Sequence, residues 1–241
     1  MTNQVINILK KDARFFPFKK KKLYPPIFIV AAASGAGKGI LMEMLNLIGS
    51  DRVSITSKIA KRYKKVHDKR DGMIAIGEKG IFPSEYDIQW EFHKPIFDKK
   101  DKHKSANKSQ KFKGIEYAVS RTEIEKSITS KRPQIFVSNI QQLDRFRKLY
   151  KNHCVFLYLH RLSSAKEIKN FQYKVCKSKD EAEIRIKEIK KVHKDYIDNI
   201  AEFDHVLLNT TYPEDLYDQM FKLLENYCQT SSNCKNLDSG N

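Results

Sequence analysis

Apolar runs of strand length alternate with amphipathic stretches of helical length along most of this chain. Four short apolar runs, at 27–33, 134–139, 154–160 and 205–209, predict buried strands. The helical spacing of apolar residues predicts helices at 39–48, 121–130, 141–150, 180–203 and 213–227. Ser120 and Pro213 are typical of residues that begin helices. Because strands alternate with helices, we expect an α/β fold with a parallel sheet and crossover helices.

The middle of the chain breaks this alternation. It holds shorter strand-like pieces and the polar stretch KKDKHKSANKSQK. We therefore predict a subdomain at 51–130, with a basic insertion at 98–111, inserted into a core formed by 24–50 and 131–228. A basic extension at 1–23 and a polar tail at 229–241 flank this domain.

The net charge of +17 is concentrated in three segments. Residues 1–22, 58–70 and 98–111 carry +6, +6 and +4, so the rest of the chain is nearly neutral. One interpretation is a solvated tail and loop. The other is weak contact of the basic tail and insertion with RNA or another polyanion.

The cysteine pattern and the hydropathy favour a soluble protein of a reducing compartment. Cys154, Cys176, Cys228 and Cys234 form no C-x-x-C pair and show no metal-ligand spacing. No apolar run reaches the length of a membrane span. We therefore expect a cytoplasmic location, no membrane span and no metal site built from protein ligands.

The strongest chemical signal lies in IFIVAAASGAGKGILMEML, residues 27–45, which predicts a buried strand, a small-residue turn and a helix. In this context Gly35, Gly37 and Lys38 are typical of a phosphate-binding loop, where backbone N–H groups and a lysine hold nucleotide phosphates. Compared with the pattern G-x-x-x-x-G-K-[ST], Ala32 replaces a glycine and Gly39 replaces the hydroxyl that binds Mg²⁺. We call residues 32–39 the phosphate loop.

The order of motifs resembles the guanylate kinase family over about residues 24–228. Ser54, Lys58 and Lys61 keep the spacing of that family's S-x-x-x-R-x-x-R, and Arg62 follows. Tyr117, in the stretch that follows Trp90 and the basic insertion, is similar to the phosphate-binding tyrosine of G-x-Y-Y-G-[ST]. EFDHVLLNT, residues 202–210, is similar to E-F-D-x-V-[IV]-x-N, whose asparagine meets the adenine of ATP.

This resemblance implies a P-loop NTPase fold with a parallel sheet flanked by helices, an inserted acceptor-binding subdomain and a helical lid at about 161–190. It implies ATP and Mg²⁺ as cofactors. The implied cofactor-binding residues are Ser34, Gly35, Ala36, Gly37, Lys38, Gly39, Ile40 and Asn209. The implied catalytic residues are Lys38, Arg161, Arg185 and Lys187, and the lid also offers Lys174 and Lys177. The implied acceptor-binding residues are Ser54, Lys58, Lys61, Arg62, Gln89, Tyr117 and Asn139.

Two positions depart from the family's guanine recognition. Gln89 and Asn139 stand where the family has carboxylates that accept hydrogen bonds from guanine, and an amide accepts more weakly. The stretch Val137-Ser138-Asn139 is similar to the ribose 1,5-bisphosphate phosphokinases, whose third strand ends in V-N. The sequence therefore disfavours strict guanine selection.

Three hypotheses about function follow. The first is ATP-dependent phosphoryl transfer to a phosphate-bearing small molecule, chiefly a nucleoside monophosphate, with a ribose 1,5-bisphosphate phosphokinase-like reaction as a variant. The second is a guanylate kinase-like binding module that is weak or inactive as a catalyst, which Gly39, Gln89 and Asn139 favour. The third is a kinase or binder whose partner is RNA or another polyanion.

Overall fold

A computed structural model describes residues 23–33, 35–48, 52–63, 72–95, 112–176, 178–210 and 212–229. Residues 1–22 of the predicted extension 1–23, the insertion at 98–111, residues 230–241 of the predicted tail 229–241, and Ser34 and Lys177 lie outside the described residues. The chain forms two compact units. The second unit is Thr56–Glu123, and the first unit is built from the segments on both sides of it.

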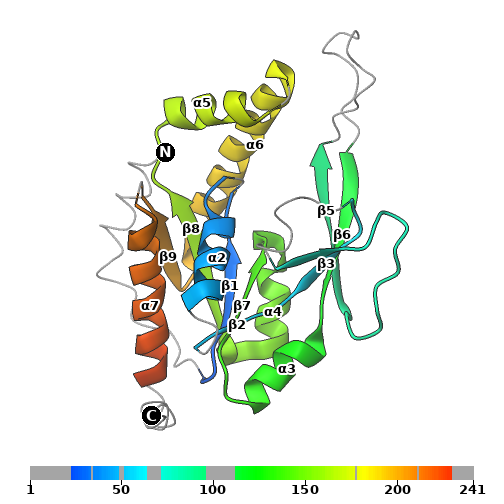
Figure 1. Cartoon of the computed structure of the whole chain (residues 1–241), viewed down its shortest axis with the longest axis vertical. Coiled ribbons are helices and arrows are strands. Elements are labelled where there is room, and N and C mark those ends of the chain that lie inside the picture. Colours follow the sequence, from blue (N-terminus) through cyan, green and yellow to red (C-terminus); the bar gives the residue numbers. More distant parts are fainter. Residues whose placement is uncertain are drawn as a thin grey trace. The chain divides into compact units, whose positions relative to one another are not determined.

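The first unit is built on a five-stranded parallel sheet with β1 at its centre (Figure 1). The order across the sheet is β2-β7-β1-β8-β9. Its strands are β1 (Ile27–Ala31), β2 (Ser54–Ile55), β7 (Gln134–Ser138), β8 (Cys154–Arg161) and β9 (His205–Asn209). Every residue of β1 is buried, as expected for a strand that has a neighbour on each side and a covered face above and below.

Helices cover both faces of this sheet. Helices α2 (Lys38–Ile48) and α7 (Pro213–Gln229) lie on one face, and α4 (Leu143–Tyr150) and α6 (Lys179–Asp198) lie on the other. The remaining helices are α3 (Arg121–Thr129) and α5 (Ala165–Val175). Short 3-10 helices occur at η1 (Ile140–Gln142), η2 (Lys151–His153) and η3 (Ile200–Glu202).

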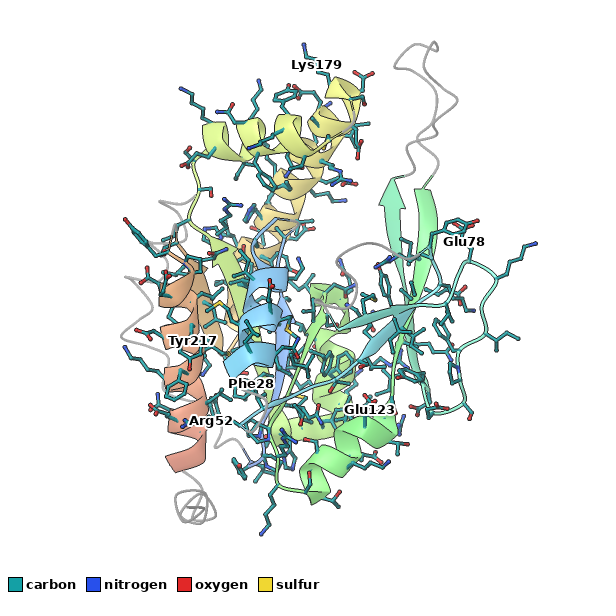
Figure 2. The ribbon with its side chains drawn as sticks, in the orientation of Figure 1. Phe28, Arg52, Glu78, Glu123, Lys179 and Tyr217 are labelled. Atoms are coloured by element: carbon teal, nitrogen blue, oxygen red, sulfur yellow. The ribbon has the colours of Figure 1, made fainter. Side chains whose placement is uncertain are left out.

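Alternate residues of the strands enter two different cores. Phe28, which Figure 2 labels, belongs to the core that β1, α2 and α7 share, together with Leu41 and Leu216. On the other face, Phe136 packs edge-on against Phe146 of α4 with ring centroids 4.9 Å apart. Because each fully buried side chain of this size contributes about 1.5–3 kcal/mol, these two layers hold the sheet and fix where its carboxyl end lies.

Helices α5 and α6 form a hairpin that begins at the carboxyl end of β8. Figure 1 shows α5 lying across the top of the first unit and α6 running from it beside the sheet. Ser164 and Glu167 form a reciprocal capping box at the start of α5, and Ser178 caps α6. The Tyr173 hydroxyl donates a hydrogen bond to Glu183, which ties the two helices together.

The second unit is a four-stranded mixed sheet in the order β4-β3-β6-β5. Its strands are β3 (Lys58–Ala60), β4 (Met73–Ala75), β5 (Ile88–Pro95) and β6 (Phe112–Val119). Strand β3 pairs parallel to β4 and antiparallel to β6. Ile59, Phe82, Tyr86 and Ala118 form a small core on one face of this sheet.

The predicted fold class is confirmed: the fold is α/β, with a parallel central sheet flanked by helices. The four predicted strands and five predicted helices are all present, with ends that differ by a few residues. Ser120 accepts a hydrogen bond from the Glu123 N–H at 3.1 Å, as expected of a residue that begins a helix. No helix within the described residues is long and apolar enough to cross a bilayer.

Candidate functional site

The phosphate loop leaves the carboxyl end of β1 and turns sharply into α2. Gly35 and Gly37 adopt φ values of +78° and +103°, in the region of backbone conformation that residues with a Cβ rarely adopt. The Ala36 N–H donates to the Ala33 carbonyl at 3.3 Å, and α2 begins at Lys38. The turn therefore brings a helix N-terminus and a lysine to the same point, which is the arrangement that binds phosphate groups.

Lys38 is held inside the turn by the carbonyls of the same loop. Its Nζ donates to Ala33 O at 2.8 Å and to Ala32 O at 3.0 Å. The ammonium group is thus positioned at the carboxyl edge of β1. A polyphosphate offers this cation a stronger, charge-assisted partner than a neutral carbonyl does.

Asn209, the last residue of β9, packs under the loop. Its Nδ2 donates to Ala36 O at 2.8 Å, and the residue is 5% exposed. A Cβ at Gly37 would lie 2.2 Å from this nitrogen, so glycine is required there by contact as well as by φ. The structure therefore places Asn209 as a support of the loop, and its contact with adenine stays a prediction.

Arg161, the last residue of β8, reaches the loop from its other side. Its Nη1 donates to Gly35 O at 3.3 Å, and its guanidinium lies 5.4 Å from the ring centroid of Phe171 in α5. A small cavity of about 20 Å³ separates the loop from the helical hairpin. It is lined by Gly35, Ala36, Arg161, Ser163, Glu167, Ile168, Phe171, Gln172, Ile189 and His193.

The other two predicted catalytic cations lie along α6. Arg185 Nη2 pairs with Glu181 at 2.9 Å within the same helix, and Lys187 is exposed. Neither residue lines the cavity beside the loop. Lys179, labelled in Figure 2, marks the outer end of the hairpin, where α6 begins. Of the three candidates Arg161, Arg185 and Lys187, only Arg161 has a described contact with the phosphate loop.

Gly39 and Ile40 occupy the first turn of α2. Gly39 is half-buried, and Ile40 is 38% exposed. Position 39 carries no hydroxyl, and within the described residues no group of three His, Cys, Asp or Glu side chains is placed to hold a metal ion. These residues therefore fit Mg²⁺ only as an ion that arrives with the nucleotide and keeps nucleotide oxygens and water as ligands.

Two of the predicted acceptor-binding residues come together in the second unit. Lys58 and Tyr117 lie on adjacent strands, on the same face of the sheet, because Ala60 is paired with Tyr117 in the β3–β6 register. The Lys58 Nζ lies 5.3 Å from the centroid of the Tyr117 ring. Both residues are largely buried, at 9% and 7% exposure.

Lys61 does not join them, contrary to the expectation from its motif spacing. Its Nζ forms an ion pair with Glu116 at 2.8 Å and lies 4.6 Å from the ring centroid of Phe82. Phe82 belongs to the small core with Ile59, on the face opposite Lys58. Successive side chains along a strand point to alternate faces of the sheet, so residues three positions apart lie on opposite faces.

The remaining acceptor candidates are dispersed. Ser54 lies in β2 of the first unit, and Arg62 in the second unit donates to the Tyr63 carbonyl at 2.8 Å. Gln89 is exposed, and its Nε2 donates to Tyr86 O at 3.2 Å. Asn139 follows β7, and its buried Oδ1 has no hydrogen-bond partner in the part of the chain described. Asn139 thus presents an acceptor at the carboxyl edge of the first sheet.

Sequence reasoning missed a buried polar cluster on the α6 face of this sheet edge. The Tyr158 hydroxyl lies 3.2 Å from His160 Nδ1 and 3.0 Å from His193 Nδ1. Burial, with a further contribution from His193, lowers the pKa of His160 to about 4, and burial also lowers the pKa of His193. The sequence did hold one sign that His193 is buried: it has helical spacing with Ile186, Ile189 and Tyr196, which are also buried residues of α6.

Neither a family profile nor a curated protein matches this sequence. Among solved structures, the chain is similar to a guanylate kinase from Anaplasma phagocytophilum, with a TM-score of 0.51 and 14% sequence identity. The similarity covers 89% of this chain and 90% of that one. The chain therefore has a guanylate kinase-like fold, and at this identity the similarity establishes the fold alone.

We expect Asn209→Asp to destabilise the phosphate loop. A carboxylate cannot donate a hydrogen bond to Ala36 O, and its oxygen would lie next to that carbonyl oxygen and repel it in a buried place. The free energy of unfolding should fall by about 1–3 kcal/mol, and stabilisation by ATP should weaken. Thermal unfolding with and without ATP measures both. Gln219→Glu is the matched control, since Gln219 Nε2 donates to Leu208 O at 2.9 Å and to Asp215 O at 2.8 Å, and neither residue belongs to the phosphate loop. An equal loss of ATP stabilisation in both variants would contradict a specific role for Asn209.

The buried histidines predict a loss of stability in acid. Because the pKa of His160 is about 4 in the folded chain and about 6.5 when unfolded, the unfolded chain binds an extra proton between these values. The free energy of unfolding should therefore fall as the pH is lowered from 6.5 towards 4, by up to about 1.4 kcal/mol per pH unit for each histidine. His160→Gln should make this slope shallower in denaturant titrations at pH 7, 6 and 5. An unchanged slope would show that His160 does not contribute.

Proposed function

We propose that the chain binds ATP at the phosphate loop and transfers the terminal phosphoryl group to a phosphate-bearing small molecule, chiefly a nucleoside monophosphate. The observation that carries this proposal is the loop itself. Two glycines with positive φ, the N-terminus of α2 and the inward-held Lys38 meet at the carboxyl end of the central strand. In open parallel sheets this edge is where ligands bind.

The donor half of the reaction needs positive charge at the transferring group more than it needs covalent chemistry. Lys38 would leave the Ala32 and Ala33 carbonyls for the β- and γ-phosphates. Arg161 is a second cation at the loop, and its bond to Gly35 O at 3.3 Å is long enough to be exchanged for a phosphate oxygen. Mg²⁺, when bound, supplies further charge neutralisation. Because Gly39 has no side-chain ligand to offer, the nucleotide and water would supply the ligands of the ion.

The acceptor half is assigned to Lys58 and Tyr117 of the second unit. A lysine and a phenol on one sheet face offer a charge and a neutral donor to a phosphate dianion. Lys61 is left out of this assignment because Glu116 already neutralises it. Gln89, in the same unit, would select the rest of the acceptor by an amide hydrogen bond, which disfavours strict guanine selection.

A binding module with little catalysis is the second candidate, and the arrangement on α6 favours it. Arg185 is engaged by Glu181 and Lys187 is exposed, so Arg161 is the one predicted lid cation with a contact to the loop within the described residues. Loss of a cation from a phosphoryl-transfer site lowers turnover more than it lowers affinity. Binding of ATP and a monophosphate without measurable ADP formation would support this second candidate and reject the first.

We expect Lys38→Ala to abolish the stabilisation of the chain by ATP. The substitution removes the charged partner of the phosphates. The Ala32 and Ala33 carbonyls lose a hydrogen bond, but the turn is only half-buried, so the fold stays intact. In thermal unfolding, the wild type at 100 times its Kd for ATP should gain about 2.7 kcal/mol, and the variant should gain almost nothing. Lys222→Ala in α7 is the control. An unchanged ATP effect in Lys38→Ala would reject the nucleotide site.

The acceptor assignment predicts different outcomes for two neighbouring lysines. Lys58→Met should weaken binding of the acceptor about tenfold or more, because it removes a charge-assisted bond worth about 1.5–3 kcal/mol. Lys61→Met should change it little, because that charge is paired with Glu116. Calorimetry with GMP, AMP and ribose 5-phosphate measures the binding, and ATP binding should stay unchanged in both variants. A larger effect of Lys61→Met than of Lys58→Met would reverse the assignment.

A further inference from the structure

A tyrosine hydroxyl bridges two buried histidines beside the phosphate loop. Tyr158 and His160 lie in β8, and His193 comes from α6, with exposures of 0%, 2% and 5%. The Tyr158 hydroxyl is 3.2 Å from His160 Nδ1 and 3.0 Å from His193 Nδ1. The stacked ring of Tyr196, with centroids 4.6 Å apart, holds Tyr158 in place from the α6 side.

Hydrogen-bond accounting assigns the protons of this cluster. A tyrosine hydroxyl has one proton, so it donates to one Nδ1 and must accept from the other. The Nε2 atom of His160 is buried and has no hydrogen-bond partner among the described residues. A buried N–H without an acceptor is rarer and costlier than an unpaired acceptor, so the His160 proton belongs on Nδ1.

The order of donors then runs in one direction. His160 Nδ1–H donates to the Tyr158 oxygen, and the Tyr158 hydroxyl donates to His193 Nδ1. His193 must therefore carry its own proton on Nε2. Burial keeps both rings neutral near pH 7, so neither Nδ1 needs a second proton.

His193 lines the cavity of about 20 Å³ between the phosphate loop and the helical hairpin. The side chains on its walls that can donate hydrogen bonds are those of Arg161, Ser163, Gln172 and His193. Gln172 Nε2 lies 3.8 Å from the position of a Cβ on Gly35. The carboxylate on the wall, Glu167, accepts the Ser164 N–H at 2.6 Å as part of the capping box. The cavity therefore has a mainly apolar wall with a few donors set into it, and it has room for about one oxygen.

We propose that His193 is a binding residue whose Nε2–H donates to an oxygen of the nucleotide's phosphates in this cavity. The inference rests on the proposed function, because the oxygen is brought there by a nucleotide held on the loop. Tyr158 and His160 are positioning residues, since they act through the tautomer of His193. A neutral N–H suits this buried place, because it offers a hydrogen bond without the cost of burying another charge.

The tautomers can be observed directly in the unmodified chain. The ring ¹⁵N signals of the seven histidines separate the two neutral tautomers, and loss of one signal in His160→Gln and in His193→Gln assigns the two that matter. We expect the proton on Nδ1 in His160 and on Nε2 in His193. A His193 proton on Nδ1 would overturn the proposal, whatever any variant does to stability.

Ligand addition tests the bound group. Saturating ATP should shift the His193 Nε2–H signal and leave His205 unmoved, since His205 Nε2 lies 3.0 Å from the Tyr227 hydroxyl at the amino end of β9. Inorganic phosphate at the same concentration should not shift His193. A shift with phosphate alone would overturn the assignment to a nucleotide and identify a free-anion site.

Variants give the size of the effect. We expect His193→Phe to weaken ATP binding about tenfold, the effect of one buried hydrogen bond, while His205→Phe leaves it unchanged. Should His193→Phe fail to fold, the titration of the wild type still decides. Binding of ATP with an unmoved His193 signal would overturn this inference alone, whereas absence of ATP binding in the wild type would overturn the proposed function as well.

Discussion

The candidate nucleotide site depends on the close packing of Asn209 against the turn at Gly37. At this point the chain has no room for a Cβ, since one would lie 2.2 Å from the Asn209 amide nitrogen. The same amide satisfies the Ala36 carbonyl at 2.8 Å, so the turn is held by a hydrogen bond and by contact together. Because Asn209 ends β9 and the loop begins at β1, the contact joins two strands that have β8 between them. The parallel sheet thereby fixes the loop from below.

A second layer of polar groups supports the loop from the side of α6. Arg161 and His193 both line the cavity beside Gly35, and Tyr158 connects His193 to the interior of the sheet. Tyr158 and His193 are buried next to this turn, and a buried polar network must be satisfied almost completely to be tolerated. In this cluster, His160 Nε2 is a buried atom without a hydrogen-bond partner among the described residues, and it fixes the direction of the donors.

The basic side chains of the two units have different neighbours and do not all serve one function. In the second unit Lys58 lies against Tyr117, whereas Lys61, three residues away, is neutralised by Glu116. In the first unit Lys38 is held by carbonyls and Arg185 by Glu181. Each of these cations is therefore held by its own neighbours, and the net charge alone does not show which of them could meet a phosphate.

The sequence by itself determined the order of strands and helices, the α/β class and the phosphate loop, because apolar periodicity and the glycines of a tight turn are local properties. It also determined the residue types at the site, such as Gly39 and Asn139. Only the tertiary structure decided which of them meet. The period of two along β3 separates Lys58 from Lys61, although motif spacing groups them. The cluster of Tyr158, His160 and His193 joins β8 to α6, and Tyr158 and His193 are 35 positions apart in the sequence. No local pattern records such a contact, since it arises only when α6 packs on the sheet.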